Sequence, residues 1–578
     1  MTPPPLPLHP LTLSPPRPLP SPEGVPAELS IPTALSAAAL LAACGGGGGD
    51  GTAASPGPAP SPGPAASPGP GPAAAPVPPT DAQAARFLAQ AGFAAPSAEI
   101  ASVKAQGYGA WLDAQFALPV TDGHFDWMVA RGYAVDANRN SFAGVDNTLW
   151  RKLLSAPDVL RQRVVLALSE IFVISMAGLA VSWRGFTVAA YMDMLEQRAF
   201  GTYRELLDGV SLSTGMGNYL NMRGNLKEDP KTGRVPDENY AREVMQLFTI
   251  GLVQLKPDGT PLLGSDGKPQ DSYVQANITD LARVFTGWDY DGASATDPAF
   301  MKKPMVNIAA RFSTGAKKVL SVDIPATADG PAALKIALDT LASHPNVAPF
   351  IGRQLIQRLV TSNPSAAYVG RISAVWASSG GSLQAVIRAI LLDPEARTAS
   401  SAPGAGKLRE PVQRFVQWGR SFGAASPTGV WNVGDTTNPA TRLGQSPLRS
   451  PSVFNFFRPG YVPPNSTLGS NAVTSPEFQL CNESTVAGYL NFMQTAIASG
   501  VGEVKASYTA ELALATDATA LVNDLALRLA AGSLSATTLA TISTAVGSIA
   551  ATTDAGKLNR VQAAILLVMA CPEYQIQK

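Results

Sequence analysis

The chain has 578 residues, of which 46% are hydrophobic and 15% are charged. Its 43 basic and 43 acidic side chains give a formal net charge of zero, and no basic run occurs, so the sequence predicts no nucleic-acid-binding surface. Three histidines and three scattered cysteines, without a His-Glu-x-x-His motif, exclude the common metal sites rich in these residues. We therefore expect no metal and no cofactor.

An apolar run precedes the first cysteine. Residues 31–43 are rich in alanine and leucine, and the run is too short to span a bilayer but typical of the core of a signal peptide. Its end, Leu41-Ala42-Ala43-Cys44, is similar to the lipobox of bacterial lipoproteins, in which the cysteine is lipidated. We expect residues 1–43 to be a signal peptide and the chain to be an exported periplasmic or outer-membrane lipoprotein of the cell envelope. The alternative is an alanine-rich segment that contains a cysteine by chance.

Residues 44–80 form a low-complexity segment. Five glycines, Gly45–Gly49, are followed by proline, alanine, serine and glycine up to about Pro79. Such a composition cannot bury enough apolar surface to form a core. The sequence therefore predicts a disordered tether that holds the next domain away from a membrane contacted through lipidated Cys44.

From residue 81 to the end, apolar residues recur with helical spacing. Leu160, Val164 and Leu168, for example, fall on one face of a helix. We expect one large, mainly α domain at residues 81–578, with many helices and few short strands. Short strands are expected around 318–322 and a small hairpin at 257–271. The main predicted helices are 82–93, 98–116, 150–177, 185–208, 276–285, 333–341, 348–360, 366–376, 383–392, 406–422 and several after 477.

The clearest helical order lies at residues 236–251. Proline followed by two acids suits the start of a helix, and Gly251 suits its end. At about 100° per residue, the apolar side chains fall on one face and four polar side chains on the other. These four are Asn239, Arg242, Glu243 and Gln246. Glu238 precedes Arg242 by four residues, which is the favourable order for an ion pair.

Further motifs flank this helix in a fixed order. They are Arg86-Phe87-Leu88, Trp111-Leu112-Asp113-Ala114-Gln115, Leu281-Ala282-Arg283-Val284-Phe285-Thr286-Gly287-Trp288, His344-Pro345-Asn346, Arg358-Leu359-Val360-Thr361-Ser362-Asn363-Pro364, Lys407-Leu408-Arg409-Glu410-Pro411, Pro451-Ser452-Val453-Phe454-Asn455-Phe456 and Cys571-Pro572-Glu573-Tyr574. Together with Pro236–Glu243 they resemble a bacterial family known as domain of unknown function 1800 (DUF 1800), over about residues 81–578. The resemblance implies an exported bacterial protein without an assigned activity. It also implies a possible protein partner, because genes of this family often neighbour those of another exported family that resembles sulfatases.

Two positions depart from the pattern of the resembled family. Asn277 stands where the family carries an aspartate, and Phe312 stands ahead of Lys317 where a histidine is common. If either family residue were catalytic, this chain would lack it.

The first candidate site joins the central helix to the Thr-Gly-Trp helix. Glu243 is a candidate base or metal ligand, Arg242 and Arg283 are candidate anion clamps, and Asn239 would lie beside them. Trp288 would offer a stacking surface, with Glu238 at the edge of the site. The alternative interpretation is an ion-pair network that joins two helices.

Other motifs allow a functional and a structural interpretation. His344 is a candidate base or ligand, but such a residue more often caps the helix after Pro345. Lys407–Pro411 could bind an anion, although a solvated helix start is the commoner case. Pro451–Tyr461 is an aromatic platform or a core under a long loop. Cys571 and Cys481 could form a disulfide, or Cys571 could be a buried thiol.

Two functional hypotheses follow from these observations. The first, which the absence of a metal or nucleophile signature favours, is a non-catalytic envelope protein that binds a partner. The second is an extracytoplasmic hydrolase or lyase with a polar cleft formed by Glu243, Arg242, Arg283 and Trp288. A pocket lined by these four side chains would favour the enzyme, and their burial without a cavity would favour the scaffold.

Overall fold

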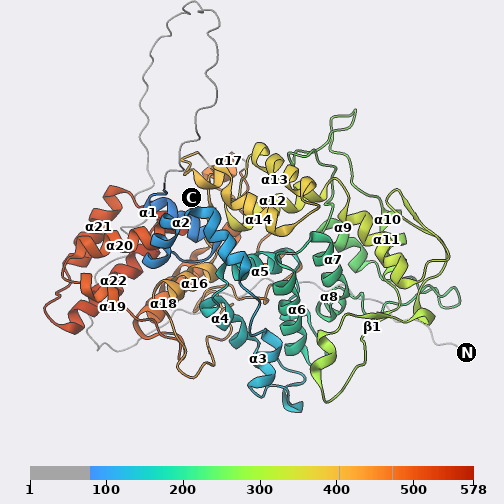
Figure 1. The fold of residues 1–578 in the computed structure, drawn as a ribbon, viewed down its shortest axis with the longest axis horizontal. Helices are drawn as coiled ribbons and strands as arrows, with labels where there is room; N and C mark the ends of the chain where they lie inside the picture. The colour runs from blue at the N-terminus through green and yellow to red at the C-terminus, as the bar shows by residue number, and fades with distance from the viewer. Residues whose placement is uncertain (1–77, 403, 472) are drawn as a thin grey trace, which may run out of the picture. The chain divides into compact units, whose positions relative to one another are not determined.

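The structure is a computed structural model that describes residues 78–402, 404–471 and 473–578. The described residues are mainly helical, as predicted, with short antiparallel two-stranded ribbons (Figure 1). The predicted signal peptide, Cys44 and almost all of the predicted tether lie outside the described residues. Among the helices that the structure describes, none is both long and apolar enough to cross a membrane.

The larger hydrophobic core is formed by the helices that precede residue 400. Its buried side chains run from Ala84 to Ala396, with Leu448 added from a later loop. The helices are α1 (Asp81–Ala91), α2 (Ser97–Ala117), α3 (His124–Ala130), α4 (Val145–Ser155), α5 (Val159–Ile171), α6 (Arg184–Arg198), α7 (Tyr203–Leu212), α8 (Thr214–Tyr219), α9 (Asn239–Gln246), α10 (Gln275–Val284), α11 (Gly330–Ala342), α12 (Val347–Leu359), α13 (Ala366–Ser378), α14 (Leu383–Leu392) and α15 (Pro394–Arg397).

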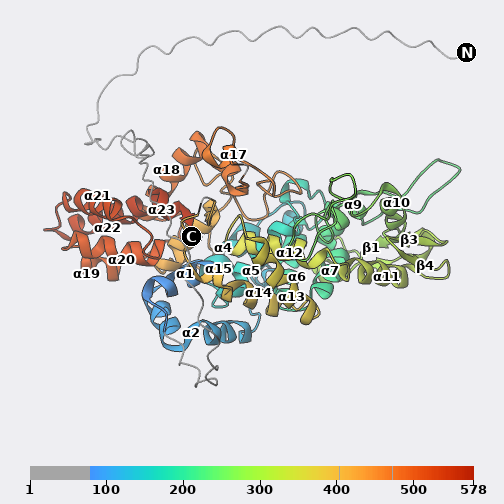
Figure 2. The ribbon, with the colours of Figure 1, turned by 90° about the horizontal axis from the view of Figure 1, so that it is seen from above.

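A smaller core is formed by the C-terminal helices, which gather at one end in Figure 2. Helix α4 contributes Trp150 to this core, and α1 packs on α20, so the beginning of the described chain lies against its last quarter (Figure 1). The helices are α16 (Pro411–Ser421), α18 (Glu483–Ser499), α19 (Thr509–Leu514), α20 (Ala518–Ala530), α21 (Ala536–Gly547), α22 (Asp554–Ala570) and α23 (Pro572–Gln575), whereas the short helix α17 (Thr467–Ser470) contributes no buried residue.

The described residues form three two-stranded ribbons, of which one joins distant parts of the chain. Strand β1 (Trp288–Asp289) pairs with β2 (Val306–Asn307), β3 (Lys317–Val319) with β4 (Val322–Ile324), and β5 (Lys407–Leu408) with β6 (Ile576–Gln577). The strands expected around 318–322 are thus confirmed. The expected hairpin at 257–271 is also present, as two consecutive tight turns with bridges at Leu255–Pro261 and Leu263–Pro269. Short 3-10 turns lie at Asp136–Asn138, Met176–Gly178, Pro298–Lys302, Ala309–Arg311 and Pro476–Leu480.

Helix α1 begins where the sequence predicts the domain to begin. The Thr80 hydroxyl accepts a hydrogen bond from the Gln83 N–H at 3.2 Å, and the Gln83 side chain accepts one from the Thr80 N–H at 2.9 Å. This capping box satisfies two N–H groups that would otherwise lack partners at the helix start.

Three predicted helices needed correction. The helix predicted at 185–208 is divided into α6 and α7, with a break between Arg198 and Tyr203. The helix predicted at 150–177 is divided into α4 and α5, because Pro157 cannot continue a helix. The helix predicted at 406–422 begins only at Pro411, because Lys407 and Leu408 pair with the C-terminal strand β6. In the last two cases the apolar spacing is helical, but a proline or the pairing with a distant strand decides the boundary.

The central helix α9 is shorter than predicted but shows the predicted faces. It starts at Asn239 rather than at Pro236, and Gly251 lies four residues beyond its C-cap, in the left-handed region at φ +69°. Its apolar side, including Tyr240, Val244 and Met245, is buried, whereas the polar stripe is half-buried.

Candidate functional site

Glu238 ties the polar stripe of α9 to helix α10. Its carboxylate lies 3.2 Å from the Arg242 guanidinium, which confirms the predicted ion pair. It also accepts hydrogen bonds from Gln275 Nε2 and Thr279 Oγ1, both at 2.8 Å. Arg242 in turn donates to Gln275 Oε1 at 3.4 Å. These contacts form a helix-joining network, as the structural interpretation expects.

Glu243, like Asn239 and Gln246 of the same stripe, takes no part in this network. Its Oε2 atom is buried and has no hydrogen-bond partner among the described residues. Burial raises the pKa of Glu243, and the charge of Arg242 offsets part of this effect. Tyr273 lies close enough to be influenced by both charges. Glu243 is therefore a carboxyl group whose burial no hydrogen bond compensates.

Arg283 and Trp288 do not join Glu243 in one cleft. The Arg283 guanidinium donates to the carbonyls of Thr314 and Ala316, at 2.7 and 2.9 Å, and so holds the loop before β3. The Trp288 side chain is 3% exposed and donates its indole N–H to the Val284 carbonyl at 3.2 Å. Trp288 is therefore a core residue, and its ring is not exposed for stacking on a ligand.

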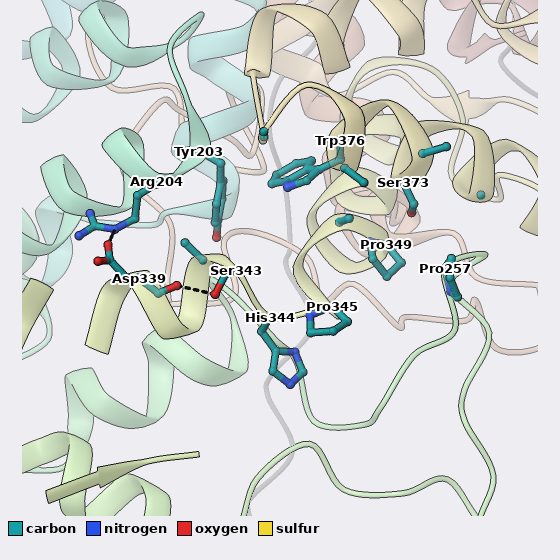
Figure 3. A pocket seen from close by; sticks show the side chains of 17 residues that line it. Tyr203, Arg204, Pro257, Asp339, Ser343, His344, Pro345, Pro349, Ser373 and Trp376 are labelled. Carbon is teal, nitrogen blue, oxygen red and sulfur yellow. Dashed lines mark hydrogen bonds and ion pairs between the residues drawn. The ribbon is translucent and has the colours of Figure 1, made fainter. Parts of the chain in front are cut away.

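The structure has a different hollow, between α7, α11, α12 and α13. It has a volume of about 640 Å³ and a mainly apolar lining (Figure 3). The rings of Tyr203 and Trp376 lie side by side in it, 5.0 Å apart between centroids. The Tyr203 hydroxyl donates to the Phe248 carbonyl, so this ring is fixed in place.

A polar rim surrounds this apolar floor. Arg204 and Asp339 form an ion pair at 2.8 Å, on the far side of Tyr203 from Trp376 in Figure 3. Ser343 and His344 follow at the end of α11, and Ser373 lines the hollow from α13. The combination of an apolar floor and a few polar groups at the edge is typical of ligand-binding pockets.

His344 stands between this hollow and a second, more polar one. Its Nδ1 atom accepts a hydrogen bond from the Asn346 N–H at 3.1 Å, so the ring caps the turn before α12 as the structural interpretation expects. Burial lowers the pKa of His344, which favours the neutral ring with a proton on Nε2. Among the predicted binding residues, His344 is the one that the structure places at a pocket.

The second hollow has a volume of about 900 Å³ and lies on the other side of His344. Tyr273, Asn277 and Lys318 line it, together with Asp339 and His344, which border both hollows. The charge of Glu243 on α9 contributes to the raised pKa of Tyr273, after burial and the opposing charge of Arg242. Sequence reasoning missed Tyr203 and Trp376, because their common position results from packing between α7 and α13.

The comparisons with known proteins give one family. A model of the family described as "Protein of unknown function (DUF1800)" matches residues 86–576. The chain belongs to this family. No curated protein and no solved structure is significantly similar to the chain.

The DUF1800 motif at Lys407–Pro411 is buried, which corrects the expectation of a solvated helix start. The side chain of Lys407 lies 3.4 Å from Glu477 and 3.6 Å from Glu410, and its ammonium donates to the Arg358 carbonyl at 2.9 Å. These residues connect the two hydrophobic cores. We call Glu170, Arg358, Lys407, Glu410 and Glu477 the charged seam.

Two carboxyl groups of the charged seam, those of Glu170 and Glu410, influence each other's pKa. Burial, and next the charge of Glu410, raise the pKa of Glu170 well above its usual value. Burial alone would raise the pKa of Glu410 too, but Lys407 and the neighbouring Glu170 hold it below its usual value. Glu170 is therefore the protonated partner and Glu410 the ionised one.

A second buried cluster in the DUF1800 domain contains potential metal ligands. His124, Asp193 and Glu196 place ligand atoms within 4.8 Å of one another. The Lys152 ammonium already lies 3.0 Å from Glu196, and the carboxylate of Asp193 accepts the N–H groups of His124 and Phe125 at 2.6 and 2.9 Å. These groups are thus engaged with protein partners, and we interpret the cluster as structural.

The remaining motifs have mixed outcomes. In the Pro451–Tyr461 segment, Phe457 is buried under the Arg358 guanidinium at 4.6 Å, whereas Phe454 is 38% exposed. Cys481 is exposed and Cys571 is buried, and both are free thiols. The structure therefore shows the buried thiol rather than the disulfide.

Proposed function

We propose that this chain is an exported, lipid-anchored protein of the bacterial cell envelope and that its DUF1800 domain binds a protein partner without catalysis. The apolar hollow with Tyr203 and Trp376 at its floor carries the proposal. A pocket of this kind receives an apolar anchor side chain of a partner, while the polar rim excludes water around it.

Exposed apolar side chains next to the hollows support a protein partner. Val274 and Val322, which line the second hollow, are 61% and 38% exposed. Large apolar side chains that gather at the edge of a pocket are typical of a protein-binding surface. Two hollows side by side would bind an extended segment rather than a single small molecule.

The experiment is photo-crosslinking from the hollow in the native bacterial host. Ala374 and Ala377 line the hollow on exposed positions of α13. A photoreactive residue at Ala377 is expected to capture one defined protein, and Ala374→Trp, which fills the hollow, is expected to abolish this crosslink. Ser378→Trp lies on the same helix but outside the lining and should leave the crosslink intact. If the chains with Ala374→Trp and Ser378→Trp form the crosslink equally well, the proposal is refuted.

The lipid anchor has a separate test. Labelling with a radioactive fatty acid is expected to mark the wild-type chain and not Cys44→Ser. If both chains are labelled equally, or neither is, the anchor is not at Cys44.

One observation favours the alternative, an extracytoplasmic hydrolase or lyase. Glu243 keeps an unpaired, buried carboxyl oxygen and a raised pKa, as general acids and bases often do. In this case an ester or polymer substrate would be cleaved by the wild type and by Glu238→Gln, but not by Glu243→Gln. Loss of cleavage in both variants would indicate a structural effect of the network instead.

A further inference from the structure

Two arginines from distant parts of the chain lie together between α1, α2 and α15. Arg86 belongs to α1 and to the first motif of the family, and Arg397 is the last residue of α15. Arg86 donates to the Thr398 carbonyl at 3.0 Å, and Arg397 donates to the Gln90 side chain. The Arg397 guanidinium also lies over the rings of Phe87 and Tyr108, 5.0 and 5.3 Å from their centroids.

Five N–H-bearing nitrogen atoms of this cluster lack acceptors. They are Nε and Nη1 of Arg86, Nε and Nη1 of Arg397, and Nε2 of Gln90, all buried and without hydrogen-bond partners in the part of the chain that the structure describes. Gln90 itself is fully buried. Stacking on the aromatic rings uses the faces of the Arg397 guanidinium and leaves the N–H groups in its plane unpaired. Buried donors without acceptors are costly, so their accumulation in one place needs an explanation.

Among the residues that the structure describes, no carboxylate forms an ion pair with Arg86 or Arg397. Acids close to them in the sequence are paired with other bases: Asp393 and Glu395 with Arg371, at 2.7 and 3.1 Å, and Asp81 with Lys104 at 2.7 Å. Burial lowers the pKa of Arg397 to about 10, and the positive charge of Arg86 contributes to the lowering.

Other arginines that the structure describes leave fewer donors unpaired. Arg161, Arg163 and Arg358 each keep one buried nitrogen without a hydrogen-bond partner. Arg560 donates to four backbone carbonyls, those of Gly547, Ile549, Ala515 and Thr516. Arg528 pairs with Glu511 at 2.6 Å. Arg86 and Arg397 leave two unpaired nitrogens each, whereas these other arginines leave one or none.

We propose that Arg86, Arg397 and Gln90 form a binding site for a phosphate group. A phosphate carries up to two negative charges near neutral pH, which match two guanidinium groups, and its oxygens accept several N–H donors at once. This site is separate from the hollow at Tyr203 and Trp376, and so the inference stands independently of the proposed function.

The test is binding of inorganic phosphate to the full chain at constant ionic strength, by isothermal titration calorimetry. The wild type is expected to show saturable binding that chloride does not reproduce. Arg397→Gln and Arg86→Gln are each expected to weaken this binding about tenfold or more, because each removes charge-assisted hydrogen bonds. Arg397→Lys keeps the charge but loses the planar fork and should be intermediate.

Arg371→Gln is the matched control, because Arg371 is a neighbouring arginine that already has acidic partners. It should bind phosphate like the wild type. Circular dichroism of each variant at the titration temperature verifies that it is folded, and a variant that is unfolded is replaced by Gln90→Leu, which should also weaken binding. No saturable binding by the wild type, or equal binding by folded Arg397→Gln, overturns the proposal.

Vesicles distinguish two sources of the phosphate group. If phosphatidylglycerol vesicles and the free ion both bind in an Arg397-dependent manner, the site is open to lipid headgroups. If only the free ion does, the site takes a small phosphate.

Discussion

The polar stripe of α9 and the charged seam both contain a basic side chain paired with a glutamate, but the two pairs differ in burial. Glu238 and Arg242 are 30% and 41% exposed at their side chains, whereas Lys407 and Glu410 are fully buried. In the stripe, water screens the charges and one lost partner can be replaced by solvent. In the seam, each charge depends on its protein partners, so the loss of one leaves the others uncompensated. The comparison shows that a motif rich in charge can be structural in the interior and available for binding near the surface.

Removal of the Lys407 charge should lower the free energy of unfolding more than any of the other changes. Lys407→Met leaves Glu410 and Glu477 buried without their cation, which should cost about 3–5 kcal/mol of unfolding free energy. Urea denaturation of the full chain measures it. Lys303→Met, which removes a half-exposed lysine paired with Asp291 at 3.2 Å, is the control and should cost below about 1 kcal/mol. A loss as small as that of the control would show that the seam is well solvated.

Neutralisation of Glu170 should change the pH dependence of stability. Because its pKa is raised in the folded state, protonated Glu170 adds stability at low pH that is lost as pH rises above the unfolded value towards the folded pKa. Glu170→Gln keeps the shape and cannot ionise, so its stability relative to the wild type should rise with pH, by at most about 1.4 kcal/mol per pH unit. Denaturation midpoints from pH 5 to pH 8 measure this. Parallel curves for the two proteins would contradict the assignment of the proton to Glu170.

Glu238→Gln should have a smaller effect. The glutamine can still accept the hydrogen bond from Thr279, but it loses the partly exposed ion pair with Arg242, which is worth about 0.5–1 kcal/mol. The same urea titration measures it, and added salt should reduce the difference. A loss above about 3 kcal/mol would place this residue with the buried charges of the seam.

Glu243→Gln should change the free energy of unfolding least, and it should raise stability rather than lower it. The pKa of Glu243 is raised by burial, so at neutral pH its ionised form is held at a cost that glutamine avoids. Since the side chain is only partly buried, the gain should stay below about 1 kcal/mol. Thermal unfolding at pH 7.5 measures it. A marked drop in melting temperature would instead mean that Glu243 has a cationic partner on which the fold depends.

The predicted and observed structures agree where the signals are local. The start of α1 follows from Thr80 and Gln83, three residues apart, and the faces of α9 follow from helical spacing within eight residues. The ion pair of Glu238 and Arg242 joins residues only four positions apart, about one helical turn, so it too could be predicted from local sequence. The mainly α fold could be predicted because many such local signals agree.

The sequence by itself therefore determined the helices, the polar front of α9, the family and the expectation of a lipidated Cys44. Only the tertiary structure decided which polar residues are buried and which line a hollow. Lys407 is buried because Glu477, 70 positions later, and Arg358, 49 positions earlier, meet it between the cores. Tyr203 and Trp376 form one hollow because α7 and α13 fold against each other. Burial and pocket formation depend on contacts between residues far apart in the chain, and helical periodicity contains no information about which distant faces meet.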